Sequence, residues 1–191
     1  IHLSLCGSNS SRSQTHFALS YCLSVIIYVP FLNIINLFDS VMNLLSTHDT
    51  PRILTILGEG DFSISREQKA ESKLEGKMLH IAYERLFCAL FLEFMLPGAP
   101  CIYYGDEIGL EGYRDPFNRG SFRWERTNQK LTDFFRFLGK LRRFCPALKE
   151  GRFLEAQYEK GYVSYLRVCD KGEIYVMVNT SDKNADIWLL P

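Results

Sequence analysis

Two short stretches decide the fold of this chain: VMNLLSTHD at residues 41–49 and PGAPCIYYGDE at residues 97–107. In each, a short apolar run leads directly into polar or acidic residues, which is the pattern of a buried strand. A long helix is expected between them, from about Lys69 to Met95, because the second half of that segment is apolar nearly all round. A strand, a helix and a strand in this order predict parallel strands, since a parallel crossover needs about a dozen residues or more.

The polar residues that follow the two strands are the first candidates for a functional site. His48 and Asp49 follow the first strand, and Asp106 and Glu107 follow the second. In folds with parallel strands, reactive groups lie beyond the carboxyl ends of the strands. We therefore expect these two pairs to lie near one site.

The sequence pattern changes near Gly151. Before it, apolar residues at helical spacing predict an amphipathic helix over Leu131–Cys145, which Pro146 ends. Beyond it, the spacing changes to two, which predicts a small antiparallel sheet. Its four expected strands lie at 153–157, 162–169, 173–179 and 185–190. A domain boundary is expected near residues 148–151.

Composition and charge exclude some classes of protein. The chain has 191 residues, 47% of them hydrophobic, so a buried core is expected. Basic and acidic residues number 22 each, which argues against a nucleic-acid binder held by electrostatics. The six cysteines form no Cys-x-x-Cys pair and none sits at metal-ligand spacing from a histidine. We predict buried reduced thiols and a cytoplasmic location, although three disulfides stay possible.

The segment over residues 17–38 contains no charged residue. It is long enough for a membrane span, which needs about 20 apolar residues. Pro30, Asn33 and Asn36 argue against a span, and no basic region or cleavage site supports a secretory signal. We favour two buried helical stretches broken at Pro30, or a misassigned segment, and keep a membrane anchor as the alternative.

The two stretches resemble the α-amylase family of glycoside hydrolases, in its cyclomaltodextrinase and neopullulanase branch. The segment GYRDPFNR at 112–119 and the aromatic helix before Pro146 resemble the same branch. The resemblance covers roughly residues 38–191, whereas residues 1–30 show no motif of the family. Three places depart from the usual family pattern: Ser46-Thr47, Gly120 and Arg123.

The resemblance implies a (β/α)8 barrel followed by a β-domain. The fold class is then α/β plus β, with barrel strand seven over 41–45, strand eight over 101–104 and an incomplete antiparallel β-domain. The expected domains are an unassigned segment over 1–37, the C-terminal portion of the catalytic barrel over 38–148, and the start of an all-β domain over 149–191. Because a complete barrel needs at least about 200 residues, the chain is expected to be a C-terminal fragment.

The resemblance also implies roles for individual residues. Retaining glycosidases use two carboxylates, a nucleophile and a general acid. The family carries them after strands four and five, and we identify no counterpart of either here. Asp49 would instead bind sugar hydroxyls and stabilise the transition state, and His48 would bind the same sugar. Asp115 and Arg119 would contact sugar further along the donor side, or simply pair with each other in a solvated loop.

Five further residues are expected to support the site: Arg52, Tyr104, Asp106, Glu107 and Trp124. Glu107 is expected to be a buried, paired carboxylate that holds the strand ends, because buried charges demand partners. Tyr103 and Tyr104 are expected to pack within their strand, and Trp124 to stack on a sugar or to pack. We expect no cofactor and no metal site.

Together these expectations describe part of an α-glucan hydrolase that acts on cyclodextrins, maltooligosaccharides or pullulan. Without a nucleophile and an acid, the chain is expected to be inactive alone. It is also expected to be poorly soluble, because two parallel strands would expose their edges. A homodimeric parent enzyme is compatible with this branch. The alternative is a non-catalytic amylase-like subunit that residues 17–38 anchor in a membrane.

Overall fold

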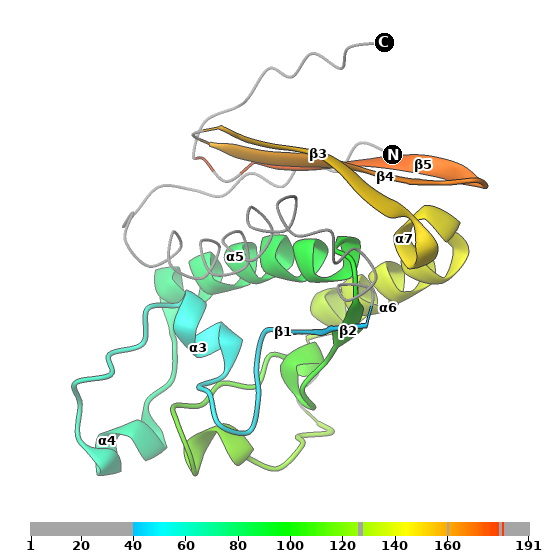
Figure 1. Ribbon diagram of the computed structural model, residues 1–191. Coiled ribbons are helices and arrows are strands. Elements are labelled where there is room, and N and C mark those ends of the chain that lie inside the picture. Colours follow the sequence, from blue (N-terminus) through cyan, green and yellow to red (C-terminus); the bar gives the residue numbers. More distant parts are fainter. Residues whose placement is uncertain (1–39, 126–127, 160, 180, 182–191) are drawn as a thin grey trace.

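The computed structural model describes residues 40–125, 128–159, 161–179 and 181 (Figure 1). The uncharged segment over 17–38 and the strand expected over 185–190 lie outside these residues. Among the helices that are described, none is long and apolar enough to cross a membrane.

Two short parallel strands form the first sheet, as predicted. β1 (Met42–Leu44) pairs with β2 (Ala99–Cys101), with Met42 opposite Ala99 and Leu44 opposite Cys101. The second strand was expected over 101–104, and this was wrong, because pairing begins at Ala99, whose N–H donates to the carbonyl of Val41 at 2.8 Å. It ends at Cys101, so Tyr103 and Tyr104 lie beyond the strand rather than in it.

The crossover between the strands contains three helices: α3 (Ile53–Leu57), α4 (Arg66–Glu71) and α5 (Gly76–Met95). The single helix expected from Lys69 was wrong, because the chain leaves the helix at Ser72 and resumes it at Gly76. In the interruption, the N–H of Leu74 donates to Glu111 at 2.7 Å. A tertiary contact therefore replaces the hydrogen bond that a continuous helix would make there.

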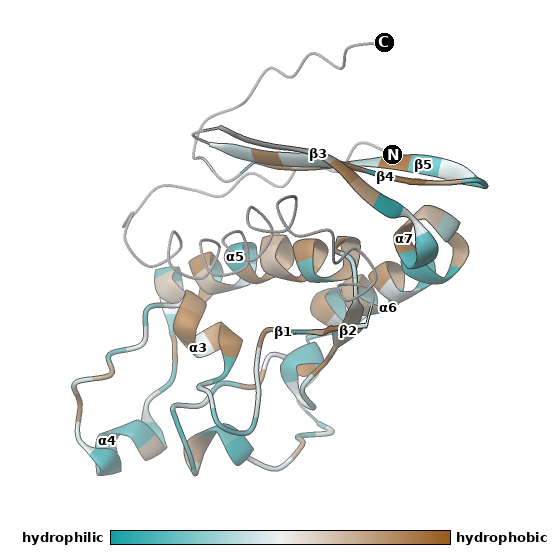
Figure 2. Cartoon of the chain, in the orientation of Figure 1, coloured by the Kyte–Doolittle hydropathy of each residue, from teal (hydrophilic) through white to brown (hydrophobic). Residues whose placement is uncertain are grey.

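The core lies around α5. Helix α6 (Gln129–Phe144) buries Leu131, Phe135 and Leu138, which confirms the apolar face predicted for it. α3 packs against α5 from the side of β1, and both helices carry much of the hydrophobic colour (Figure 2). Arg142 of α6 donates to the carbonyls of Phe94, Leu96 and Gly98, which satisfies backbone groups at the end of α5.

A three-stranded antiparallel sheet forms the second layer, on the opposite side of α5 from β1 (Figure 1). After a short helix, α7 (Pro146–Glu150), come β3 (Arg152–Glu159), β4 (Tyr162–Cys169) and β5 (Gly172–Asn179). The strands predicted first, second and third are confirmed. The side chain of Arg167 is fully buried and donates to the carbonyls of Gly151 and Met95, which ties this sheet to the end of α5.

Candidate functional site

A tight turn over residues 47–50 follows β1 and carries the two principal candidates. The N–H of Thr47 donates to the hydroxyl of Thr50 at 2.9 Å, and the N–H of Asp49 donates to the hydroxyl of Thr47 at 3.1 Å. His48 Nε2 lies 3.1 Å from Asp49 Oδ2, and their side chains are 67% and 73% exposed. An imidazole and a carboxylate therefore stand side by side and open to solvent at the carboxyl end of a parallel strand.

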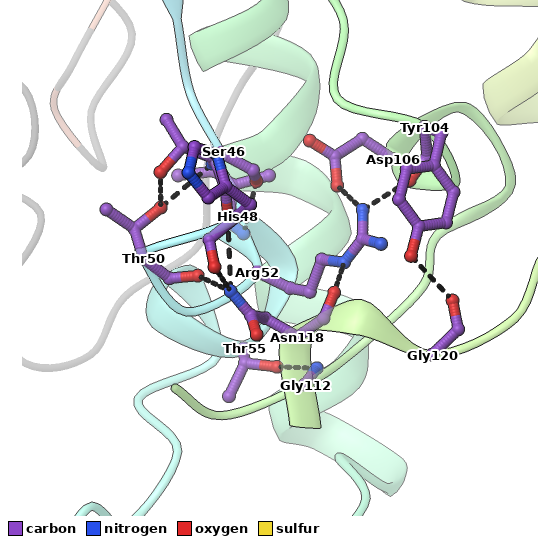
Figure 3. Close-up of polar contacts among 12 residues, drawn as sticks. Ser46, His48, Thr50, Arg52, Thr55, Tyr104, Asp106, Gly112, Asn118 and Gly120 are labelled. Carbon is purple, nitrogen blue, oxygen red and sulfur yellow. Dashed lines mark hydrogen bonds and ion pairs between the residues drawn. The ribbon is translucent and has the colours of Figure 1, made fainter. Parts of the chain in front are cut away.

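Behind the turn lies a buried arginine, Arg52, whose side chain contacts the residues after β2 and the loop that carries Asn118 (Figure 3). Its Nη1 donates to Asp106 Oδ1 at 3.0 Å and to the carbonyl of Tyr104, and its Nε donates to the carbonyl of Asn118 at 2.8 Å. Its guanidinium lies 4.1 Å from the ring centroid of Tyr103. The charge is thus paired with Asp106, hydrogen-bonded through Nε and Nη1 and covered by an aromatic ring, whereas the buried Nη2 has no hydrogen-bond partner among the described residues.

Asp106, rather than Glu107, is the buried carboxylate that joins the strand ends. Asp106 is 5% exposed and also hydrogen-bonds Ser46, so it links the residues that follow β1 and β2. Gly105 adopts the left-handed backbone region and begins a single 3-10 turn, Asp106–Ile108. In this turn Asp106 is buried against Arg52 while Glu107 is only partly buried, so the role expected of Glu107 was assigned one residue too far along the chain.

Two carboxyl groups near the strand ends have raised pKa values. Burial raises the pKa of Asp106 to about 6, although hydrogen bonds from Ser46 and the charge of Arg52 lower it. Burial also raises the pKa of Glu93, in α5, to about 8, against the lowering effect of a hydrogen bond from the backbone N–H of Cys101. Burial thus favours the protonated form of Glu93, whose carboxyl group contacts Cys101 of β2.

The loop over residues 112–120 forms the far side of the site. Its first residue, Gly112, accepts a hydrogen bond from the N–H of Arg52 and donates its own N–H to the hydroxyl of Thr55, both at 2.9 Å. A 3-10 turn over Phe117–Arg119 places Asn118 beneath the turn that carries His48 and Asp49. The loop is therefore fastened to the first turn of α3.

Asp115 and Arg119 pair with each other, and Arg119 also approaches the turn. Arg119 Nε lies 2.7 Å from Asp115 Oδ1 and donates to the carbonyl of His48 at 3.3 Å, and a terminal nitrogen lies 3.9 Å from Asp49 Oδ1. The pairing kept as the ordinary alternative is thus present. The same contacts bring all four residues of the predicted site together: His48, Asp49, Asp115 and Arg119.

The aromatic candidates take different positions. Tyr104 donates its hydroxyl to the carbonyl of Gly120 at 3.0 Å and, with Tyr103, covers Arg52. Trp124 is 80% exposed and its ring lies 4.6 Å from that of Phe122. Tyr104 therefore supports the buried arginine, whereas Trp124 presents most of its ring to solvent.

Sequence reasoning missed Asn118 and Glu93. Asn118 lies within the motif-bearing loop but resembles an ordinary turn residue, and only the fold shows that its side chain is fully buried against the carbonyls of the turn. Glu93 lies among apolar residues of α5, and its place within the otherwise apolar second half of the expected helix was the only available signal.

Comparison with known proteins places this chain in a family. The model of the α-amylase catalytic domain matches residues 9–140, more than half of the sequence, and the chain belongs to the α-amylase family. The match begins within the segment over 1–37 that the sequence motifs left unassigned.

Several relatives show how much of such a protein the chain spans. It is 40% identical over 126 residues to an amylopullulanase of Thermoanaerobacter thermohydrosulfuricus, covering 66% of this chain and 8% of that protein. It is 35% identical over 145 residues to a cyclomaltodextrinase of a Bacillus species, covering 74% of this chain and 22% of that protein. An α-amylase structure from Anoxybacillus superposes with a TM-score of 0.65 at 29% identity, covering 85% of this chain and 31% of the other. The chain thus spans less than a third of these relatives.

Proposed function

We propose that this chain contributes to retaining hydrolysis of α-glucans, namely cyclodextrins, maltooligosaccharides or pullulan, and that Asp49 is the residue that stabilises the transition state. The observation that carries the proposal is the exposed, adjacent pair of His48 and Asp49 at the carboxyl end of β1. Membership of the α-amylase family supports it, as do relatives named amylopullulanase and cyclomaltodextrinase.

The chemistry of the pair suits a sugar ring. A carboxylate accepts hydrogen bonds from two neighbouring hydroxyls, and charge-assisted hydrogen bonds of this kind are about twice as strong as neutral ones. Glycoside hydrolysis passes through an oxocarbenium-like transition state with a distorted ring, in which hydrogen bonds to ring hydroxyls strengthen. Asp49 would supply these bonds, and His48 would bind an adjacent hydroxyl.

Asp115 and Arg119 would extend the site along the sugar chain. Arg119 lies between the carboxylates of Asp49 and Asp115, at 3.9 and 2.7 Å, so these three charged side chains would offer a sugar one polar surface. Such a surface, about half exposed at Arg119, fits the alternating hydroxyls of a neighbouring sugar residue.

On this proposal the 191 residues supply part of a hydrolytic site, and by themselves they bind a sugar without cleaving it. A retaining enzyme needs a nucleophile and a general acid about 5–5.5 Å apart, and the sequence motifs supply neither. Binding by Asp49 and its neighbours alone would be weak, since a pocket usually buries most of its ligand.

The test is a titration of the chain with maltohexaose, followed by NMR, together with chromatography of the sugar after prolonged incubation. We expect weak saturable binding that Asp49→Ala reduces at least about tenfold, with no shortening of the sugar. Asp133→Ala, which removes an exposed carboxylate paired with Arg136 on α6, is the matched control and should bind as the wild type does. Binding that Asp49→Ala leaves unchanged would overturn the site, and turnover that this variant abolishes would overturn the inactivity.

A further inference from the structure

Asn118 hydrogen-bonds the turn that carries His48 and Asp49, but its own side chain is buried beneath that turn. Its side chain is 0% exposed, and Nδ2 donates to the carbonyls of His48 at 2.7 Å, of Thr50 at 2.8 Å and of Thr47 at 3.3 Å (Figure 3). Two amide hydrogens therefore serve three carbonyl oxygens of one turn.

We propose that Asn118 is a positioning residue for His48 and Asp49, and that its amide group holds the turn over 47–50 in the orientation that presents both side chains to a sugar. The importance of that orientation for a sugar rests on the function proposed above. The hold on the turn itself rests on hydrogen bonds and burial alone.

The turn depends on side chains for its shape. Its N–H groups at Thr47 and Asp49 donate to the hydroxyls of Thr50 and Thr47, so these amides are satisfied within the turn by side-chain oxygens. The carbonyls of Thr47, His48 and Thr50 point the other way, toward one nitrogen. Without that nitrogen, the carbonyls of Thr47 and Thr50 would lose this donor and the carbonyl of His48 would keep only the contact with Arg119, a loss that the turn would relieve by opening.

Asn118 is itself held in place from the opposite side. Its backbone carbonyl accepts a hydrogen bond from Arg52 Nε at 2.8 Å, and Arg52 is paired with Asp106. The next residue, Arg119, donates to the carbonyl of His48, so two successive residues of the loop contact the same peptide group. The buried arginine thus fixes the loop, and the loop fixes the turn.

The chemistry of the contact requires an amide. Asn118 Oδ1 has no hydrogen-bond partner among the described residues, so the polar contribution of the side chain comes from Nδ2. Asn118→Asp keeps the shape of the side chain but places a carboxylate oxygen against three carbonyl oxygens. Asn118→Ala removes the donor and leaves space.

The experiment compares both variants with Ser164→Ala as the matched control. Ser164 is also 0% exposed and hydrogen-bonded, to Tyr175, but lies in β4, which is not part of the site. Two quantities are measured below the unfolding temperature: the affinity for maltohexaose and the hydrogen exchange of the Thr47 and Asp49 amides. We expect each Asn118 variant to weaken binding and to speed exchange at these amides, both by about tenfold, while Ser164→Ala lowers stability without changing either.

The outcomes separate this inference from the proposed function. Exchange at Thr47 and Asp49 that matches the wild type in both Asn118 variants overturns the inference, whatever happens to sugar binding. Faster exchange without any sugar binding, in the wild type or in the variants, supports the hold on the turn and overturns the proposed function instead. If neither variant folds, the side-chain amide protons of Asn118 are followed in the wild type, where slow exchange supports the hydrogen bonds and exchange as fast as that of an exposed asparagine overturns them.

Discussion

Glu93 is a buried carboxyl group whose two oxygens have unequal surroundings. One oxygen has no hydrogen-bond partner among the described residues, and the backbone N–H of Cys101 donates to this carboxyl group. Burial therefore dominates and raises its pKa from 4.5 to about 8, and the nearby carboxyl of Asp106 adds to the rise. The protonated form is the one that this position favours.

This raised pKa predicts a stability that falls as the pH rises. Between 4.5 and about 8 the folded chain keeps the proton of Glu93, whereas the unfolded chain releases it, so folding becomes less favourable across this range. Asp106, with its pKa raised to about 6, acts in the same direction at lower pH. Because Asp106 is still about half protonated at pH 6, the range from pH 7 to 8 separates Glu93 from it best.

Glu93→Gln keeps the acceptor for Cys101 and removes the titration. In urea unfolding, the free energy of unfolding of the wild type should fall by on the order of 1 kcal/mol per pH unit between pH 6 and 8 because of Glu93. The variant should lack this contribution to the pH dependence. Equal slopes in the two proteins would mean that Glu93 is already ionised in the folded chain, which would contradict the prediction.

Site residues that directly follow a predicted strand could be identified from the sequence. Site residues whose role depends on buried contacts with distant parts of the chain could not. His48 and Asp49 follow an apolar run at a strand end, so their place was predicted from the pattern alone. The importance of Asn118 comes from three carbonyls that lie 68 to 71 residues away in the chain, and nothing local in the sequence records such contacts. The confusion of Asp106 with Glu107 has the same origin, because the backbone turn at Gly105 decides which of them faces Arg52.

Among the elements, the pairing of β1 with β2 depends on one glycine. Gly98 has a φ of 91°, and a Cβ atom placed on it would lie 2.6 Å from the carbonyl oxygen of Val41. That same oxygen accepts the hydrogen bond from Ala99 with which the pairing begins. Both the backbone conformation and the close approach therefore require glycine at this position.

Gly98→Ala should destabilise the chain by roughly 1–3 kcal/mol, because an L residue is strained in this backbone region and the contact with Val41 must open. Gly139→Ala is the control: Gly139 lies in α6 with nothing within 4 Å of an added Cβ, so alanine should stabilise by about 0.5–1 kcal/mol. Denaturant unfolding of both variants checks the prediction. A destabilisation of Gly98→Ala no larger than measurement error would show that the strands pair without this approach.

Elements were predictable where periodicity decides them. The apolar face of α6 and the alternation of buried residues toward the end of β5 follow directly from the spacing of their residues. The ends of β2 and the break between α4 and α5 were not predictable, because tertiary contacts set them. At the break, the side chain of Leu74 packs so close to Gly58 that a Cβ atom there would clash with it. The backbone N–H of Leu74 donates to Glu111.

At the scale of the whole molecule, the first sheet is small and its strands leave apolar side chains exposed. Met42 is 65% exposed and Leu44 44% exposed on β1, and Ile102 is exposed just beyond β2. Within the part of the chain that the structure describes, this two-stranded parallel sheet also has two edges without a paired strand, and their backbone groups can pair with another chain. Parallel sheets elsewhere are almost always covered on both faces.

These exposed strands predict self-association of the 191-residue chain, which we expect to see as a mass that rises with concentration in sedimentation or light scattering. Met42→Lys should reduce it, because a lysine on an exposed strand opposes edge-to-edge pairing, and should cost little stability, since the Met42 side chain buries little surface. Phe144→Lys is the matched control, because Phe144 is also largely exposed, at 76%, but lies at the end of α6, where no strand edge is available. If both variants reduce the association equally, general surface hydrophobicity drives it rather than the strands. If only Met42→Lys does so, the open pair of β1 and β2 is the surface through which the chain associates, and the turn that carries His48 and Asp49, which follows directly from β1, lies beside that contact.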